Sequence, residues 1–278
     1  NLTITLDTLA QAAGITTLTA TASKTNTFTI KSGYTSALTI AMAATEVIDA
    51  SAYTGVLTIT GDMDLIASSD TLTGGTGTSD ELSLSADTST DALDKTKMAN
   101  VSGFEKITLT KNVTATLKTA EGNVADGKTL TVNANALTST VFTFDGSEEN
   151  DGTFSISAAG SGAHTVTLGN LNDTYSSSST GADSVTATAG NNTISTGDGA
   201  DVIIGGTGGD NITAGNGNDT IKFTTSNFTS ADTIDGGAGT DTIHITDAAT
   251  VVDDDFKNVS NTEVVTTKAD IAFTALTL

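Results

Sequence analysis

The chain lacks several residue types, and each absence removes a class of structure or function. Its 278 residues include no Cys, Pro or Trp, and Arg does not occur. Without cysteine no disulfide framework can form. Aromatic residues make up only 4% of the chain, which leaves little surface on which a sugar ring could stack. No run of about 18 apolar residues occurs, so the sequence predicts no transmembrane helix.

Positive charge is also scarce. The chain has 11 Lys and no Arg against 33 Asp and Glu, which gives a formal net charge of -22. This excess of acid argues against nucleic acid and anionic membranes as partners and favours bound cations. Acidic residues outside any periodic pattern are interpreted as solubilising surface charges; examples are Asp87, Asp91, Glu148 and Glu149.

Catalytic motifs are missing as well. The two histidines, His164 and His244, are not in H-E-x-x-H spacing, and no G-x-S-x-G occurs. His244 is predicted to be a surface strand residue, and Tyr34, Tyr53 and Tyr175 are expected to be structural. We therefore expect no enzyme activity within these residues. A catalytic domain outside them stays open as an alternative.

The most informative pattern is a nine-residue repeat that runs from Gly181 to Lys222. In the frame G-G-x-G-x-D-x-U-x, U is a large apolar residue. The acidic position of this frame holds Asp183, Asn192, Asp201, Asp210 and Asp219. The apolar position, two residues later, holds Val185, Ile194, Ile203, Ile212 and Ile221. After a break at residues 223–230 the frame resumes at Asp232 and again at Asp241. A fixed period with glycine turns predicts an all-β parallel β-roll or β-helix whose turns bind Ca²⁺.

The residue types suit that chemistry. Glycine lets a turn adopt positive φ and brings backbone carbonyls close to an ion. Ca²⁺ takes six to eight oxygen ligands, which one carboxylate per turn and several carbonyls can supply. The turn residues expected to supply further oxygens are Thr196, Asp198, Gly199, Gly205, Thr207, Gly208, Ala214, Asn216, Gly217, Gly236, Ala238 and Gly239.

These units resemble the nonapeptide repeats of the repeats-in-toxin (RTX) family of secreted bacterial proteins. The resemblance implies that two nonapeptides form one coil and that ions lie between turns eighteen residues apart. Asp183, Asp201 and Asp219 would then form one column, and Asn192 and Asp210 the other. Asn192 removes a charge, so a weaker site is expected there. The resemblance also implies type I secretion of an unfolded chain that folds outside the cell.

Outside the repeats, Thr alternates with aliphatic residues, which predicts half-buried strands in an additional strand-rich solenoid. The clearest strands are expected at residues 2–6, 27–30, 56–60, 107–110 and 165–168. Two short helices are expected, at Asp91–Asn100 and Asp253–Asn258, because both begin with acidic residues.

A larger module occurs twice, about 160 residues apart. Each copy has a glycine-rich turn, a strand, a short acidic segment and the sequence N-V-S-x-x-E before another strand, in residues 74–110 and 236–267. The first copy places Asp80 at the acidic position after one extra residue, and Asp70 fits a preceding unit. Both are candidate calcium ligands. The module resembles the C-terminal solenoids of surface-layer, biofilm-matrix and adhesin proteins of Gram-negative bacteria.

Four segments are expected: a strand-rich solenoid at 1–66, a degenerate turn with a β-module at 67–177, the calcium β-roll at 178–247 and a C-terminal β-module at 248–278. Because the chain starts with Asn and has no leader, we expect a processed product or a fragment.

The expected function is that of a calcium-dependent structural unit of a bacterial surface layer or extracellular matrix, located at the cell surface or in the secreted matrix. Its candidate partners are further copies of itself and cell-surface polysaccharide. The alternatives are an adhesin stalk and the non-catalytic repeat domain of a larger secreted enzyme or toxin. Ice binding by a Thr array is a further alternative, but the Thr-x-Thr pairs do not share one register with the repeats.

Overall fold

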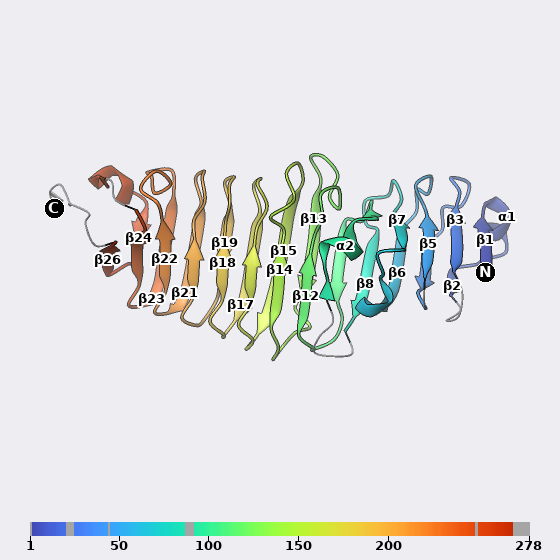
Figure 1. Cartoon of the computed structure of the whole chain (residues 1–278), viewed down its shortest axis with the longest axis horizontal. Helices are drawn as coiled ribbons and strands as arrows, with labels where there is room; N and C mark the ends of the chain where they lie inside the picture. The colour runs from blue at the N-terminus through green and yellow to red at the C-terminus, as the bar shows by residue number, and fades with distance from the viewer. Residues whose placement is uncertain (1, 21–24, 44, 87–91, 248–249, 269–278) are drawn as a thin grey trace.

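Alternation of Thr or Ser with apolar residues produces strands with one buried and one solvent-facing side. In β15 (Thr153–Gly160), for example, Phe154, Ile156 and Ala158 are buried while the residues between them are half-buried. A computed structural model describes residues 2–20, 25–43, 45–86, 92–247 and 250–268. The strands stack along one axis as an elongated parallel solenoid with the first and last strands, β1 and β26, toward opposite ends (Figure 1). The predicted all-β solenoid is confirmed.

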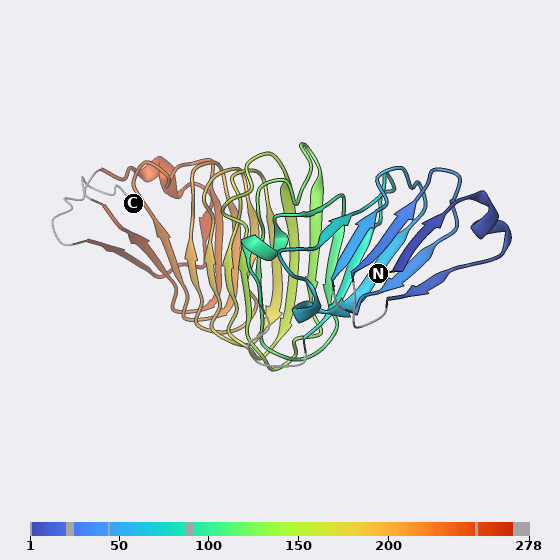
Figure 2. The ribbon, with the colours of Figure 1, turned by 45° about the vertical axis from the view of Figure 1, so that its right-hand side comes forward.

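Three parallel sheets form the walls of the solenoid. The five-stranded sheet belongs to the N-terminal coils and contains β1 (Leu2–Leu6), β3 (Asn26–Ile30), β5 (Glu46–Asp49), β7 (Thr71–Thr73) and β10 (Val101–Ser102). The twelve-stranded sheet runs through all coils and contains β2 (Thr17–Thr19), β4 (Leu38–Ala41), β6 (Leu57–Asp62), β8 (Glu81–Ser85), β11 (Lys106–Leu109), β13 (Thr129–Ala134), β15, β17 (Thr174–Ser179), β19 (Thr193–Ser195), β21 (Asn211–Gly217), β23 (Thr233–Gly239) and β25 (Val259–Ser260). The nine-stranded sheet contains β9 (Ala92–Leu93), β12 (Ala115–Lys118), β14 (Phe142–Asp145), β16 (Thr165–Thr167), β18 (Ser184–Thr186), β20 (Val202–Ile204), β22 (Thr220–Phe223), β24 (Thr242–Ile245) and β26 (Val264–Thr267). Figure 2 shows that the coils continue from the N-terminal to the C-terminal end of the stack.

The core is a set of ranks, in which residues of successive coils lie on top of one another. In the nine-stranded sheet one rank joins Val185, Ile203, Ile221 and Ile243. In the twelve-stranded sheet the facing rank joins Ile156, Tyr175, Ile194, Ile212 and Ile234. All of these side chains are at most 1% exposed. The predicted inward position of the nonapeptide is therefore confirmed, with one aliphatic core residue per unit.

The five strands expected most clearly are present as β1, β3, β6, β11 and β16, with bounds that shift by at most two residues. The two expected helices are shorter than predicted. α2 covers only Lys95–Met98 and is capped by Asp94, and the second segment is a 3-10 helix, η2 (Asp253–Phe256). Asp87 and Asp91 lie outside the described residues. Two further short helices, α1 (Thr8–Ala12) and η1 (Met63–Leu65), were not predicted. No helix of the described part is long and apolar enough to span a membrane.

The duplicated module has the same hydrogen bonds in both copies. The Glu105 carboxylate accepts from the Asp80 amide at 2.9 Å, and the Glu263 carboxylate accepts from the Asp241 amide at 2.9 Å. The Asn side chain of N-V-S-x-x-E also has one role: Asn100 donates to the Ser68 carbonyl, and Asn258 donates to the Ser230 carbonyl. The sequence repeat is therefore a structural repeat as well.

The outer face of the twelve-stranded sheet carries a mixed polar array. One outward rank joins Thr131, Ser155, Thr174, Thr193 and Asn211 in register. Because Ser155 and Asn211 interrupt the Thr residues of this rank, a Thr-x-Thr pair does not recur at every coil. This agrees with the expected lack of a common Thr register.

Replacement of one core aliphatic should destabilise the whole stack. Ile212 is fully buried between the Ile194 and Ile234 strands, so Ile212→Ala should lower the free energy of unfolding by about 2–5 kcal/mol. Thr213→Ala, on the exposed face of the same strand, should change it by less than about 0.5 kcal/mol. Denaturant unfolding in saturating calcium measures both values. Equal effects would contradict the inward assignment of Ile212.

Candidate metal centre

Side chains of successive coils form a continuous column of hydrogen bonds along one edge of the solenoid, and the aspartates of this column are buried. We call this column ladder one; its members are His164, Asp183, Asp201, Asp219, Asp241 and Glu263. Each side chain after His164 accepts a hydrogen bond from the backbone amide of the ladder member one coil earlier. The bonds to Asp201, Asp219 and Asp241 measure 2.7, 2.8 and 2.8 Å. His164 donates its amide to Asp183 at 2.8 Å, and Glu263 is the last member of the column among the described residues.

A second column, ladder two, runs along another edge and contains Asp173, Asn192, Asp210 and Asp232. The Phe154 amide donates to Asp173, and the next three bonds, each 2.9 Å long, follow the same pattern. The expected separation of the repeats into two columns is therefore present. Asp183, Asp201 and Asp219 lie in one column, and Asn192 and Asp210 lie in the other.

The two oxygens of a ladder aspartate have different surroundings. In Asp201, Asp210, Asp219 and Asp241, Oδ1 accepts the amide of the ladder member one coil earlier. In four ladder members of the described chain, Oδ2 is buried and has no hydrogen-bond partner: Asp201, Asp210, Asp219 and Asp241. The Thr196 hydroxyl lies near Asp201 but donates to the Ala214 carbonyl at 2.8 Å. A buried carboxylate oxygen without a donor is costly unless a cation neutralises it.

Other candidate ligands have both polar atoms occupied by protein groups. Asp232 accepts at Oδ2 from the Thr229 amide, and Asp183 accepts there from the Tyr175 hydroxyl. The Asn192 amide donates to two carbonyls of its own turn.

Asp70 and Asp80, the two candidate ligands nearer the N-terminus, also accept protein hydrogen bonds at both carboxylate oxygens. The carboxylate of Asp70 accepts the amides of Glu46 and Ala67, and that of Asp80 accepts the amides of Leu57 and Gly75. The role of these aspartates as calcium ligands stays a prediction.

The predicted turn residues stack next to the ladders. Thr196, Asp198 and Gly199 lie one coil before Ala214, Asn216 and Gly217, with Asp198 bridged to Asn216. Asn216 and Gly217 in turn pair with Ala238 and Gly239, next to Gly236. Gly205, Thr207 and Gly208 form the turn of ladder two, where the Thr207 amide donates to the Thr188 carbonyl. Backbone carbonyls therefore lie in the same turns as the unpartnered carboxylate oxygens.

Burial shifts the acidities of the ladder residues. Desolvation raises the pKa of Asp201 from its ordinary value of 3.8 to about 6, and it raises the pKa of Asp173 to about 6 as well. The pKa values of Asp210 and Asp219 are raised for the same reason, with neighbouring ladder carboxylates adding to the effect. Like charges stacked in a low-dielectric edge therefore oppose each other.

The donor set fits calcium. Carboxylate oxygens and turn carbonyls are the hard ligands that Ca²⁺ prefers, and the turns before Asp201, Asp210, Asp219 and Asp241 contain no Cys or His. Bound Ca²⁺ would supply positive charge to the unpartnered Oδ2 atoms of Asp201, Asp210, Asp219 and Asp241. The Oδ1 atoms hold the successive coils together through backbone amides.

Several ladder members were missed because their spacing departs from eighteen residues. His164 precedes Asp183 by 19 residues, and Glu263 follows Asp241 by 22. Glu149 was interpreted as a surface charge, which is wrong. It is fully buried, and its carboxylate accepts the amides of Val124 and Gly152. Glu148 is half-exposed and pairs with Lys95 at 2.7 Å.

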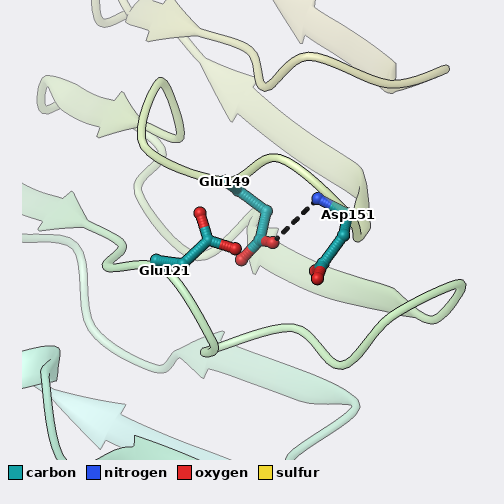
Figure 3. Close-up of side chains that lie close together, drawn as sticks. All are labelled: Glu121, Glu149 and Asp151. Atoms are coloured by element: carbon teal, nitrogen blue, oxygen red, sulfur yellow. Dashed lines mark hydrogen bonds between the residues drawn. The ribbon is translucent and has the colours of Figure 1, made fainter.

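A separate acidic cluster lies outside the repeats. Side-chain oxygens of Glu121, Glu149 and Asp151 lie within 4.8 Å of one another (Figure 3). Both oxygens of Glu149 already accept backbone amides, including that of Asp151 at 3.4 Å. The cluster is therefore part of a hydrogen-bonded turn and differs from the four unpartnered aspartates.

In chelator, the coils around Asp201 should fold more readily as the pH falls from 7.5 to 5. Burial raises the pKa of Asp201 to about 6, so the folded state holds a proton that the unfolded state releases between about pH 4 and 6. The free-energy cost of burying the charged form of Asp201 is therefore absent below about pH 4 and complete above about pH 6. Circular dichroism of the chain in chelator at pH 5 and 7.5 tests this, because protonation should increase the β signal at pH 5. Asp201→Asn should reduce the pH dependence, and a larger β signal at pH 7.5 than at pH 5 would contradict the assignment.

A side chain at Gly217 should disrupt the calcium turns. This glycine has a φ of 149°, and an added Cβ would lie 1.5 Å from the Gly199 carbonyl oxygen. Gly217→Ala should therefore weaken the calcium response at least tenfold, about 1.4 kcal/mol. Gly122→Ala is the matched control, because Gly122 also has positive φ but has open space around it. Calcium titration followed by circular dichroism compares them, and equal responses would refute close stacking of the turns.

Comparison with known proteins agrees with this geometry. A family model for the RTX calcium-binding nonapeptide repeat, in four copies, matches residues 177–212, 204–222 and 229–244. No curated protein and no solved structure matches the chain. The matched residues include all four aspartates with an unpartnered Oδ2. Over this part of its length, the chain matches the RTX calcium-binding nonapeptide repeat.

Proposed function

We propose that this chain is a non-enzymatic structural protein that folds on binding calcium and builds a bacterial surface layer or extracellular matrix. The observation that carries the proposal is the set of four buried, unpartnered aspartate oxygens in stacked turns. Ions that bind only the folded form stabilise it by mass action. Calcium would therefore act as a folding cofactor.

Secretion follows from the same property. A chain that stays loose at sub-micromolar calcium could pass a type I secretion channel unfolded and fold at millimolar calcium outside the cell. The absence of cysteine is compatible with this route, because no disulfide has to form before or after export. The proposed location is the cell surface or the secreted matrix.

Assembly with further copies is supported by the shape and charge of the molecule. Twelve coils at about 4.8 Å each form a stack of roughly 50 Å. A net charge of -22 keeps copies apart until cations screen or bridge them. Calcium would thus promote both folding and lateral contact. Cell-surface polysaccharide is a second proposed partner.

A stalk of an adhesin, or the repeat domain of a larger secreted enzyme or toxin, is the alternative. The extended stack favours it, because a rigid rod can also act as a spacer between two other domains. Folding on calcium would be common to both functions. Self-association separates them.

Addition of millimolar Ca²⁺ should convert the monomeric chain into ordered two-dimensional assemblies. Light scattering and negative-stain electron microscopy measure this. Mg²⁺ at the same concentration is the control and should have little effect, because it requires a tighter octahedral shell. A chain that folds on calcium but stays monomeric would contradict the surface-layer function and favour the stalk.

A further inference from the structure

The first aspartate of ladder one differs from those above it. Asp183 accepts the His164 amide at Oδ1, as every ladder member accepts the amide of the coil before it. Its Oδ2 accepts the Tyr175 hydroxyl at 3.0 Å, whereas Oδ2 of Asp201 and Asp219 has no hydrogen-bond partner. Three aspartates of one column therefore share one position in the repeat and differ in whether a protein donor reaches the second oxygen.

The donor comes from the core rank of the opposite wall. Tyr175 lies in β17, between Ile156 below and Ile194 above. The next members of that rank, Ile212 and Ile234, are also aliphatic. Tyr175 is fully buried, and burial raises the pKa of its phenol, so the hydroxyl keeps its proton. Isoleucine offers no donor, which leaves the second oxygen of the later aspartates unpartnered.

Coils before Tyr175 satisfy their buried aspartates with protein groups. Asp173 accepts the amides of Phe154 and Gly169 at 2.7 and 2.8 Å. The position below Asp183 in ladder one holds His164, which accepts the Phe142 amide at Nδ1. Asp80 has two amide donors as well. These turns contain no aspartate oxygen that lacks a donor.

We propose that the Tyr175 hydroxyl takes the place of a calcium ion at the first rung of ladder one. The chain up to β18 then folds without calcium, and its last coil is the template on which the calcium-dependent coils add. This inference rests on the proposed role of calcium in folding. It assigns Asp183, despite its motif position, to the calcium-independent part of the molecule.

Two matched variants of one column test the assignment. Asp183→Asn keeps the acceptor for the His164 amide, and its amide group can donate to the Tyr175 oxygen. It should leave the number of bound Ca²⁺ ions unchanged. Asp201→Asn should remove at least one ion. Equilibrium dialysis with ⁴⁵Ca²⁺ on the full chain counts them, and equal losses in the two variants would overturn the proposal.

Hydrogen exchange of the full-length wild-type chain gives a second, independent test that needs no variant. In chelator, amides of β3 to β18 should be protected, while those of β19 to β24 should exchange freely. Calcium should then protect both groups. Exchange of the whole chain in chelator would overturn the inference yet leave calcium-driven folding intact. Full protection in chelator would overturn both.

A pair of tyrosine variants tests the role of the hydroxyl itself. Tyr175→Phe should shorten the block protected in chelator by exposing amides of β17 and β18. Tyr34→Phe removes another buried hydroxyl, which donates to the Ile15 carbonyl far from the ladders, and should leave the end of that block unchanged. The same change in both variants, or in neither, would contradict the assigned role of Tyr175.

Discussion

The hydrogen bond between a buried side-chain oxygen and the backbone amide of the preceding coil is the interaction on which the stack depends. It joins successive coils at Asp201, Asp219 and Asp241 and fixes their vertical register. This arrangement also costs free energy, because each aspartate places a charged carboxylate at a desolvated edge of the solenoid. The second oxygen must find a proton donor or a cation.

The molecule meets this requirement in two ways along its length. Before β18, backbone amides and the Tyr175 hydroxyl satisfy the buried aspartates, and His164 takes the acidic position of one coil and accepts the Phe142 amide. In the repeats the turns are built from glycine, whose carbonyls approach closely and whose amides do not reach Oδ2 of Asp201 or Asp219. Core composition changes in parallel. The earlier coils contain packed aromatic rings such as Phe144 and Phe154, 5.0 Å apart, whereas each nonapeptide contributes one aliphatic residue. Less apolar burial per residue makes an ionic contribution more important there.

The nonapeptide period predicted the solenoid, the two columns and the inward aliphatic rank, because a strict repeat of eighteen residues per coil fixes which residues stack. Insertions change the number of residues per coil, so the stacking can no longer be predicted from an eighteen-residue repeat. Residues 223–230 change the spacing to 22, and Glu263 joins ladder one through the strand register of the N-V-S-x-x-E module. Glu149 was misread because its burial depends on a turn that only the fold creates. The difference between Asp183 and Asp201 could not be read from the motif, since it depends on a tyrosine that reaches across the core.

The most direct test is a crystal structure grown with Ca²⁺, in which anomalous scattering locates the ions. Ions should lie about 2.3–2.6 Å from Oδ2 of Asp201, Asp210, Asp219 and Asp241, with carbonyls of the adjacent turns completing the shell. Asp183 should keep its hydrogen bond to Tyr175. An ordered ladder in which those four oxygens contact only protein or water would contradict the role of calcium in completing this fold.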